Sequence, residues 1–411
     1  MPTKRTFREE KNFKFKLAFF IFTGIILFLP FLKTQASTLW QTAGLKNKGF
    51  ASAGAGNETD ITTSNLGTVY IAFQDKKSGS KVRVRKLNGD EWVDLADSNS
   101  PGGIVSSQEG YKPSVVAKED EVYVTFSDQS ENNRIRVKKW NGSTWNDLSD
   151  SLHPLGLISS QKGEEPEIMF NKSGNFLYVA FRDEASGNRI KFLKWNKSQW
   201  EEVSDENNPG GFASPGAGTE VAIAASKIDD SMYLTYEDVS NNLRLKVRKF
   251  DGSHWTDITD SAHPDGLITK MPAYSPSLDV DSQDRLYIVY TYKREGNTYV
   301  LYWNGSNWGS LGNGIAARGK TIESTIGVDG NNNVLVAMSQ YKKVGKRKIS
   351  WGIRVKKWSD NSWKDVSDSK HKQGFLSKKG KGDPAFAFFS GKTYISFTDC
   401  GFSKKARVMF Y

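Results

Sequence analysis

Short stretches of alternating apolar and polar residues recur along most of the chain, bounded by Gly, Asn, Asp and Ser. Such period-two runs with turn residues between them predict short β-strands. One run, Val122 to Asp128, recurs as a strand centred on a Tyr or Leu. The centres are Tyr70, Tyr123, Tyr178, Tyr233, Tyr287, Leu335 and Tyr394. No stretch after residue 36 keeps a helical period over ten residues, so we expect essentially no long helix.

A second motif follows every copy of this strand except the last. It consists of an alternating stretch, a tight turn such as Asn141-Gly142, and a Trp. Asn-Gly between alternating strands is the strongest short hairpin signal. The Trp recurs as Trp92, Trp145, Trp200, Trp255, Trp308 and Trp363, and Trp40 supplies one more copy near the start. With an inner strand before each Tyr strand, the repeat holds four strands in about 54 residues.

The two ends of the repeat array complement each other. Residues 39–44 contain the outer-strand Trp40, whereas residues 384–411 stop where a repeat would finish its third strand. Pairing them would remove the open edges of a linear array. We therefore predict an all-β fold over residues 37–411, a seven-bladed β-propeller of four-stranded antiparallel blades. The N-terminal outer strand would close it by pairing with three C-terminal strands.

Residues 1–36 differ from the rest of the chain. Basic residues from Lys4 to Lys16 precede an apolar run from Leu17 to Leu32, and a small-residue pattern ends at Ala36. This order predicts a signal peptide cleaved after Ala36, and hence a secreted or periplasmic protein with no stable membrane span after cleavage. The apolar run is shorter than the roughly 20 residues of a spanning helix, but a retained anchor stays open. The single cysteine, Cys400, excludes an intrachain disulfide and lipid attachment.

The repeats resemble known material. Units of the form Tyr-Val-Ala-Phe-x-Asp, as at Tyr178 to Asp183, followed by Asn-Gly-x-x-Trp, resemble the propeller repeats of secreted bacterial proteins. The architecture is akin to that of fucose-specific lectins and the central domain of galactose oxidase. The resemblance covers residues 37–411 and implies a fold but no specific activity, because propellers host many functions.

Several repeated residues permit a functional and a structural interpretation. Asp75, Asp128, Asp183, Asp238 and Asp399 end the Tyr strands, and either contact ligand or accept backbone N–H groups in the following turn. The outer-strand Trp residues either stack on sugar rings or pack between blades. His153, His263 and His371 share one position, where other repeats have Ser100 and Asn208. In each case the regularity favours structure.

The sequence predicts no metal and no cofactor. The Asp-rich stretches at Asp279 to Asp284 and Asp329 to Asn333 invite a calcium hypothesis. Both lie at predicted turns, where Asp, Asn and Gly are turn formers, and neither matches the twelve-residue calcium loop. No Ser-His-Asp set, His-Glu-x-x-His or phosphate-binding glycine loop is present. Catalytic groups could still converge from different blades, so an enzyme is not excluded.

Positive charge is concentrated in one sector. Removing the 7 Lys/Arg and 2 Asp/Glu of residues 1–36 leaves 50 basic against 44 acidic residues, and residues 341–381 hold 14 Lys/Arg against three Asp. In a meander, the loops after the Tyr strands and the long connections between blades, such as Ser149 to Pro166, emerge on one face. The basic loop residues predicted to bind there are Lys342, Lys343, Lys346, Arg347, Lys348, Lys370, Lys372, Lys378, Lys379 and Lys381.

These observations favour a non-catalytic binding or adhesion module, expected to be a monomer, for a glycan or an anionic envelope polymer. No nucleic-acid-binding signature is present, so nucleic acid is not an expected partner. A solvated lysine-rich loop without a partner is the structural alternative. Two other functions stay open. One is a carbohydrate-active hydrolase or lyase using Glu164, Glu165, Glu220 and Asp383, and the other is a protein-interaction scaffold.

Overall fold

The computed structural model describes residues 39–344, 348–377, 379–380 and 382–411. The predicted signal peptide lies outside these residues, so its presence and the predicted export stay predictions. The described chain is all-β, and its helices are three-residue 3-10 turns. None of these helices is long and apolar enough to cross a membrane.

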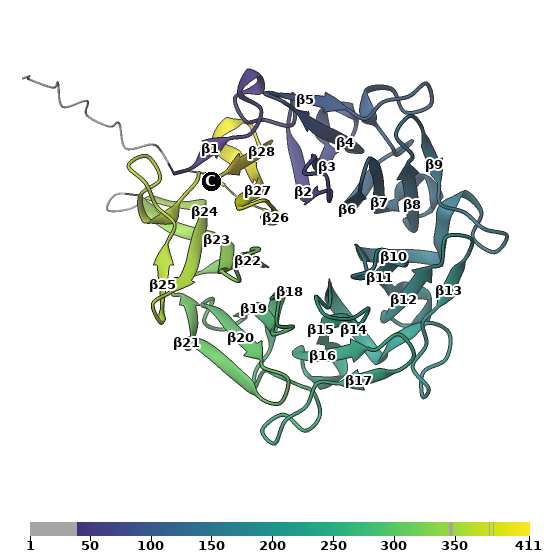
Figure 1. The fold of residues 1–411 in the computed structure, drawn as a ribbon, viewed down its shortest axis with the longest axis vertical. Helices are drawn as coiled ribbons and strands as arrows, with labels where there is room; N and C mark the ends of the chain where they lie inside the picture. The colour runs from purple at the N-terminus through teal and green to yellow at the C-terminus, as the bar shows by residue number, and fades with distance from the viewer. Residues whose placement is uncertain (1–38, 345–347, 378, 381) are drawn as a thin grey trace, which may run out of the picture. The chain divides into compact units, whose positions relative to one another are not determined.

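The described strands form antiparallel units of four, which we number as repeats 1 to 7 in chain order (Figure 1). Repeats 2 to 4 join into one sheet of twelve strands, because the inner strands of repeats 3 and 4 also pair with the third strand of the preceding repeat, whereas the other units are separate sheets. The inner strands are β2 (Gly56–Thr63), β6 (Gly110–Lys118), β10 (Leu157–Phe170), β14 (Phe212–Ala225), β18 (Ala273–Val280), β22 (Thr321–Val328) and β26 (Ala385–Phe389). The second strands are β3 (Val69–Asp75), β7 (Glu121–Asp128), β11 (Leu177–Asp183), β15 (Met232–Asp238), β19 (Leu286–Tyr292), β23 (Val334–Val344) and β27 (Lys392–Asp399).

The remaining elements complete each unit. The third strands are β4 (Lys81–Asn88), β8 (Arg134–Trp140), β12 (Arg189–Trp195), β16 (Arg244–Phe250), β20 (Thr298–Trp303), β24 (Lys348–Ser359) and β28 (Lys405–Phe410). The outer strands are β5 (Glu91–Asp94), β9 (Trp145–Asp147), β13 (Trp200–Glu202), β17 (Trp255–Asp257), β21 (Trp308–Ala317), β25 (Ser362–Asp365) and β1 (Gln41–Thr42). The 3-10 turns are η1 (Leu45–Asn47), η2 (Lys76–Ser78), η3 (Pro101–Gly103), η4 (Gln129–Glu131), η5 (Pro154–Gly156), η6 (Glu184–Ser186), η7 (Val239–Asn241), η8 (Lys372–Gly374) and η9 (Cys400–Phe402).

The inner strands surround a common centre. Each contacts the inner strand of the next repeat, from β2 through β6, β10, β14, β18 and β22 to β26, and β26 contacts β2. The N-terminal strand β1 pairs with β28, Gln41 opposite Phe410 and Thr42 opposite Met409, and so completes the sheet β1-β28-β27-β26. The two ends of the repeat array therefore share one sheet, as the sequence predicts.

The hydrophobic core lies between successive sheets. One cluster, for example, joins Val82 and Val84 of β4 to Val124 and Phe126 of β7. A strand whose two faces are both covered should be apolar at consecutive positions rather than at alternate ones. The second strands fit this rule, because every residue of β3 is buried. Burial of this kind stabilises each large apolar side chain by about 1.5–3 kcal/mol.

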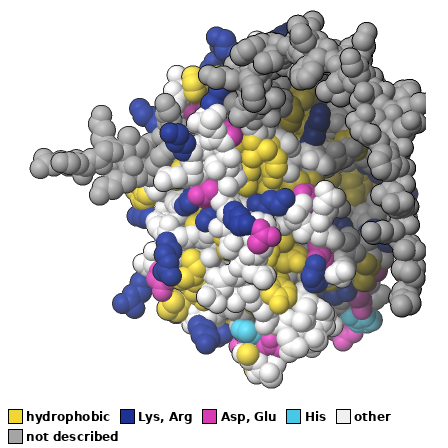
Figure 2. All heavy atoms as spheres, turned by 60° about the vertical axis from the view of Figure 1, so that its left-hand side comes forward, with side chains coloured by type: hydrophobic (Ala, Val, Ile, Leu, Met, Phe, Trp, Pro, Cys, Tyr) yellow, Lys and Arg dark blue, Asp and Glu magenta, His cyan; other side chains and the backbone are white. Residues whose placement is uncertain are grey.

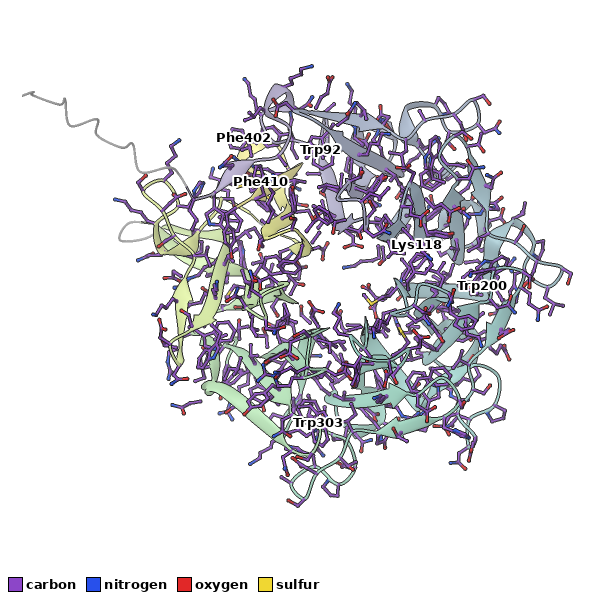
Figure 3. All side chains as sticks on the ribbon, in the orientation of Figure 1. Trp92, Lys118, Trp200, Trp303, Phe402 and Phe410 are labelled. Carbon is purple, nitrogen blue, oxygen red and sulfur yellow. The ribbon has the colours of Figure 1, made fainter. Side chains whose placement is uncertain are left out.

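The outer-strand Trp residues join neighbouring repeats, which confirms the structural interpretation of these residues. The Trp200 indole Nε1 donates to the carbonyl of Leu148 in the preceding repeat, 2.8 Å away, and its backbone N–H donates to Asp150 at 2.6 Å. The equivalent indole bonds run from Trp40 to Val366, Trp92 to Ala43, Trp145 to Leu95, Trp255 to Val203, Trp308 to Ile258 and Trp363 to Leu311. We call this contact the rim latch; Figure 3 shows Trp92 and Trp200 far from the centre.

The repeated histidines belong to this latch. The His153 Nδ1 lies 2.9 Å from the same Asp150 that receives Trp200, and Asp150 also accepts the backbone N–H of His153 at 2.7 Å. His263 with Asp260, and His371 with Asp368, repeat the arrangement. These histidines are turn residues, as their exchange with Ser and Asn suggests.

The carboxylates that end the second strands are mainly turn acceptors. Asp128 accepts the backbone N–H of Ser130 at 3.0 Å, and Asp75, Asp238 and Asp399 do the same in their own turns. Asp183 is an exception, because it caps no backbone N–H and instead accepts the Ser186 hydroxyl. Three of these carboxylates also have an arginine partner that the sequence pattern does not indicate: Arg136 lies 2.5 Å from Asp128, and Arg83 and Arg407 pair with Asp75 and Asp399.

One expectation about the connections is wrong. The sequence suggests that Ser149 to Pro166 is an irregular loop, but β10 already begins at Leu157 and pairs Leu157 with Arg136 of the preceding repeat. β14 likewise begins at Phe212, where Lys191 lies opposite it. These inner strands begin earlier than expected because their backbone groups already form hydrogen bonds with the third strand of the preceding repeat.

Candidate functional site

A bulge bends the inner strand of each of the first five repeats where the strand reaches the centre of the ring. Pairing between β2 and β3 slips between Asn57 and Asp60, and the residue inside the slip, Glu58, has φ 50°. Lys112, Glu165, Glu220 and Ser275 occupy the same place in the next four repeats, with φ between 48° and 55°. Bulges of this kind redirect a side chain. Here they turn one side chain per repeat toward the centre.

Hydrogen bonds between repeats hold these bulges. The Glu58 carboxylate accepts the backbone N–H of Lys112 at 2.7 Å, and the Glu165 carboxylate accepts that of Glu220 at 2.6 Å. The Ser275 hydroxyl accepts the backbone N–H of Ser324 at 3.0 Å. A left-handed backbone costs a non-glycine residue roughly 1–2 kcal/mol, and these bonds offset part of that cost.

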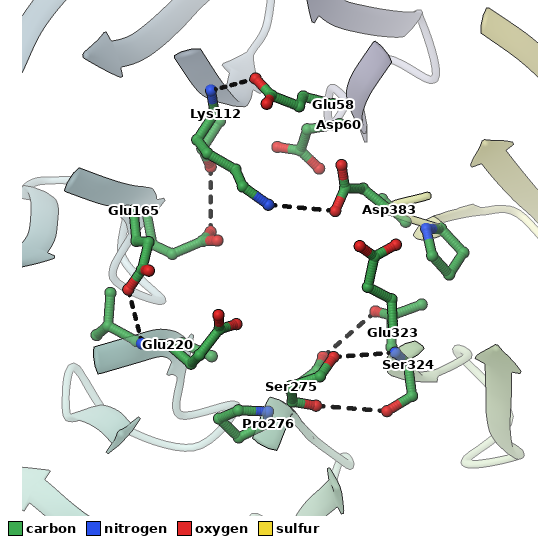
Figure 4. Close-up of a pocket in the computed structure, with 18 of the residues that line it drawn as sticks. Glu58, Asp60, Lys112, Glu165, Glu220, Ser275, Pro276, Glu323, Ser324 and Asp383 are labelled. Carbon is green, nitrogen blue, oxygen red and sulfur yellow. Dashed lines mark hydrogen bonds and ion pairs between the residues drawn. The ribbon is translucent and has the colours of Figure 1, made fainter. Parts of the chain in front are cut away.

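Together these side chains line a cavity of about 330 Å³ at the centre of the ring, which we call the hub cavity (Figure 4). We call one residue per repeat in this lining the hub positions: Glu58, Lys112, Glu165, Glu220, Ser275, Glu323 and Asp383. Asp60 and Glu167 line the same cavity from the inner strands. The hub cavity is therefore rich in carboxylates and contains a single lysine among the described residues.

Lys112 is the cation of this cavity. Its Nζ lies 3.3 Å from Asp383 Oδ1, so that the pair links repeats 2 and 7 within the cavity (Figure 4). Burial opposes the charged ammonium, but Asp383, Glu323 and Glu58 outweigh burial, so the pKa of Lys112 is raised above its ordinary value. Lys112 is therefore a permanently charged donor.

Three carboxyls of the hub cavity have pKa values above those of free carboxyls. Burial, and then the neighbouring Asp383, raises the pKa of Glu323 to about 7. Burial raises the pKa of Asp60 to about 6, and burial together with Asp60 raises that of Glu167 to about 8. The Ser114 hydroxyl donates to Glu167 at 3.2 Å. Near neutral pH these groups exchange between acid and carboxylate forms, so the hub can both donate and accept hydrogen bonds.

A second cavity, of about 360 Å³, adjoins the hub cavity. It shares Lys112 and Glu165 with the hub and extends outward to Asn133, Lys162 and Glu164. Glu164 pairs there with Arg182 and with Lys162, the latter at 2.7 Å. The site is therefore a hub with one lateral extension between repeats 2 and 3.

The structure brings three of the four predicted acidic residues together, since Glu165, Glu220 and Asp383 line the hub cavity and Glu164 lies in its extension. Sequence reasoning missed Lys112, Glu58, Asp60, Glu167 and Glu323. Aligning the repeats at their inner strands would have found them. A Pro directly follows Lys112, Glu165, Ser275 and Asp383, which marks the shared register.

The predicted lysine-rich sector is separate from the hub. None of its described residues lines the hub cavity. Lys346, Arg347, Lys378 and Lys381 lie outside the described residues, as do the side chains of Lys342, Lys343 and Lys348. Lys370, Lys372 and Lys379 are exposed. Figure 2, which brings the left-hand side of Figure 1 forward, shows Lys and Arg side chains dispersed among acidic ones.

The turns suggested for calcium are occupied by protein groups. Asp281 accepts the backbone N–H groups of Gln283 and Arg285, each at 2.9 Å, and pairs with the Arg285 side chain. Asp329 accepts those of Asn331 and Asn333. Within the described part of the chain, no three His, Cys, Asp or Glu side chains are grouped to hold a metal ion.

Comparison with known proteins adds the fold class. No protein-family model matches the chain, and no curated protein matches it. Among solved structures, an ulvan lyase of polysaccharide lyase family PL25 aligns with a TM-score of 0.53 and 12% identity, covering 88% of this chain and 94% of that chain. The SapL1 lectin, solved with alpha methyl fucoside, aligns with a TM-score of 0.50 and 14% identity, covering 77% of this chain and 97% of that chain.

A fucose lectin of Aleuria aurantia, described as a six-bladed β-propeller, aligns with a TM-score of 0.47 and 14% identity, covering 75% of this chain and 93% of that chain. At these identities the likeness concerns the fold alone. The ring of antiparallel four-stranded units is itself an all-β fold of β-propeller type.

Proposed function

We propose that this protein is a carbohydrate-binding module built on a complete seven-bladed β-propeller. The blade count is supported by the four-stranded repeats that follow one another through the described chain and by the pairing of β1 with β28. A signal peptide of residues 1–36 would export the protein, so the ligand would be an extracellular or envelope glycan. Export rests on the sequence pattern alone.

The hub cavity is the proposed glycan site, and the single observation that carries it is the set of hub positions. One position of the repeat presents Glu, Lys, Ser or Asp, around a cavity of about 330 Å³. This volume lies near the lower end of small-molecule pockets. Carboxylates accept hydrogen bonds from sugar hydroxyls, and Lys112 donates to hydroxyl or ring oxygens. The extension beside Glu164 would accommodate a second part of an oligosaccharide.

The lysine-rich sector is proposed to contact anionic groups of a longer polymer. Its residues are Lys342, Lys343, Lys346, Arg347, Lys348, Lys370, Lys372, Lys378, Lys379 and Lys381. A local excess of positive charge attracts polyanions over a distance of about 8 Å at physiological ionic strength. We propose that this sector guides the polymer toward the protein, while the hub determines which sugar is bound.

A hydrolase or lyase is the second candidate, and the shifted carboxyl pKa values favour it. General acid and base groups work best with pKa values near the operating pH. Glu323 at about 7 and Glu167 at about 8 meet this condition, and they share the cavity with the charged Lys112. Perturbed pKa values cluster at active sites, although structural networks also produce them.

A glycan array combined with a turnover assay tests the proposal. The purified protein is screened for retention on neutral and acidic glycans, and each retained glycan and related polysaccharide is assayed for new reducing ends or unsaturated products. Retention without turnover is expected, with binding weakened in Glu165→Gln. Turnover would establish the enzyme instead. If the protein shows no retention and no turnover, a carbohydrate function is contradicted.

A further inference from the structure

The connection between repeats 5 and 6 is shorter than the others. Equivalent points can be defined by pairing with the third strand. In repeat 1, Asp94 lies opposite Arg85 and Ile104 lies opposite Arg83, so the two points are ten residues apart. Repeats 4 and 6 use Asp257 to Leu267 and Asp365 to Phe375, also ten residues. Repeat 5 uses Ser310 to Ile315, which is five.

Connections of the usual length place polar groups against the third strand of the next repeat. In repeat 1, the Arg85 guanidinium donates to the carbonyl of Ala51 in the preceding connection at 2.6 Å. In repeat 4, Arg248 donates to Ala213 at 2.6 Å and pairs with Asp205. Both arginines belong to the third strand and lie opposite an Asp of the outer strand.

Lys356 holds this position in repeat 6, opposite Asp365. The short stretch from Ser310 to Ile315 contains no Asp or Glu, so Lys356 has no counterpart of Asp205. Its Nζ lies 3.4 Å from the Trp363 carbonyl and 3.8 Å from Asp365. The space left over is a cavity of about 560 Å³ between β21 on one side and β24 and β25 on the other, which we call the lateral cavity.

The lateral cavity is positively charged, in contrast to the hub cavity. Arg318, Arg354 and Lys356 line it, and the described residues in its lining include no Asp or Glu. Arg354 is neutralised by Asp365, whose carboxylate it contacts through Nε and Nη2 at 2.9 Å each. Arg318 is exposed, and its guanidinium has no partner within the part of the chain that the structure describes. The charges of Arg318 and Lys356 are therefore left in excess, because the nearby carboxylate, Asp365, already pairs with Arg354.

We propose that the lateral cavity binds the anionic substituent, a carboxylate or a sulfate ester, of an acidic saccharide. This inference rests on the proposed function, because it takes the ligand to be a carbohydrate. A guanidinium fork matches the geometry of both anions, and Arg318 is available to make it. Lys356 adds a second charge from the opposite wall. Asn361 and Ser362 place polar groups along the same cavity for sugar hydroxyls.

Calorimetric titration of the full-length protein at low ionic strength tests the inference. The probes are a uronic acid disaccharide, a sulfated disaccharide, a neutral disaccharide and inorganic sulfate. Arg318→Gln should weaken binding of at least one acidic disaccharide about tenfold, as expected for loss of one hydrogen bond between charged groups. Arg294→Gln, an exposed arginine outside this cavity, is the matched control and should change nothing. Ser362→Glu, at an exposed position, should also weaken binding.

The variants also separate this inference from the proposed function. If Glu165→Gln weakens acidic disaccharide binding and Arg318→Gln does not, the hub binds the ligand and the lateral cavity assignment is wrong. Equal losses in Arg318→Gln and Arg294→Gln would mean that only net charge matters and would also overturn it. Sulfate binding that depends on Arg318, without binding of any saccharide, would contradict both the saccharide assignment and the proposed function.

Discussion

The rim and the hub of this ring use repetition in opposite ways. At the rim, every repeat places a Trp in the same position and makes the same indole bond to the preceding repeat, as Trp145 does to Leu95 and Trp200 to Leu148. At the hub, five repeats share a bulge with a left-handed residue, but that residue is Glu58 in one repeat, Lys112 in the next and Ser275 in another.

This difference distinguishes structural from functional positions. The outer-strand Trp is the same in every repeat because every repeat must pack against its neighbour. A position that keeps its backbone geometry but changes its side chain builds one asymmetric site. The hub therefore has a direction, from Lys112 and Asp383 on one side to Ser275 on the other, that the rim lacks.

The largest expected effect concerns the latch that joins the chain ends. Trp40 is buried, and it donates to Val366 and to Asp368. Trp40→Ala should lower the free energy of unfolding by about 3–5 kcal/mol, the usual cost of removing a buried aromatic side chain. Leu39→Ala, at a residue 41% exposed, should cost below about 0.5 kcal/mol. Urea unfolding measures both, and a small effect of Trp40→Ala would remove the latch from the account of stability.

The second effect separates two members of one repeated position. Asp128→Ala removes the carboxylate nearest to buried Arg136, leaving it the longer pairs with Asp147 and Glu131, and should cost about 2–3 kcal/mol. Asp183→Ala removes one contact to a hydroxyl and should cost only about 1 kcal/mol. Urea unfolding of the two variants gives the comparison directly. Equal costs would mean that the arginine partner contributes nothing and that the turn alone matters.

The third effect is a pH dependence that arises at the hub. The pKa of Glu167 is about 8 in the folded protein against an ordinary 4.5, so the folded state keeps a proton that the unfolded chain loses between these values. Stability should therefore fall as pH rises from 4.5 to 8. Glu167→Gln cannot ionise and should flatten this fall, with a gain of a few kcal/mol at pH 8.5. Thermal melting at pH 5 and 8.5 checks it, and parallel curves for both proteins would contradict the assignment.

The smallest expected effect concerns the lysine-rich sector. Lys372→Glu and Lys379→Glu change exposed residues and should alter stability by less than about 0.5 kcal/mol. Retention on an anionic polymer should weaken, most clearly at low salt, where charges are screened least. Lys46→Glu, at an exposed residue of η1, is the control. If the control weakens retention equally, the sector has no special role.

The strands and their pairing could be read from the sequence because each depends on local signals. Alternation, Asn-Gly turns and the spacing of Trp give the four strands, and the incomplete ends give the partner of β1. The rim latch was predictable in kind, since a bulky ring at one repeat position needs a neighbour. Its acceptors were not, because Leu148 and Asp150 lie about fifty residues from Trp200.

The hub was predictable only in part. Glu165, Glu220 and Asp383 stand out as acids in connections, but Lys112 looks like an ordinary surface lysine until the bulge turns it inward. The bulge depends on bonds between repeats, such as that from Lys112 to Glu58, which no local pattern encodes. The lateral cavity depends on a shortened connection, and its signal is a length difference rather than a motif.

Titration of a glycan selected on the array against the wild type and three variants decides whether the hub cavity is the glycan site. We expect Glu165→Gln and Lys112→Met to weaken binding at least tenfold, because each removes a charged group of the hub while leaving most of its packing in place. Glu91→Gln, which alters an exposed ion pair with Lys46 near the rim, serves as the matched control and should bind as the wild type does. Unchanged affinity in both hub variants would contradict the claim that the hub cavity is the glycan site.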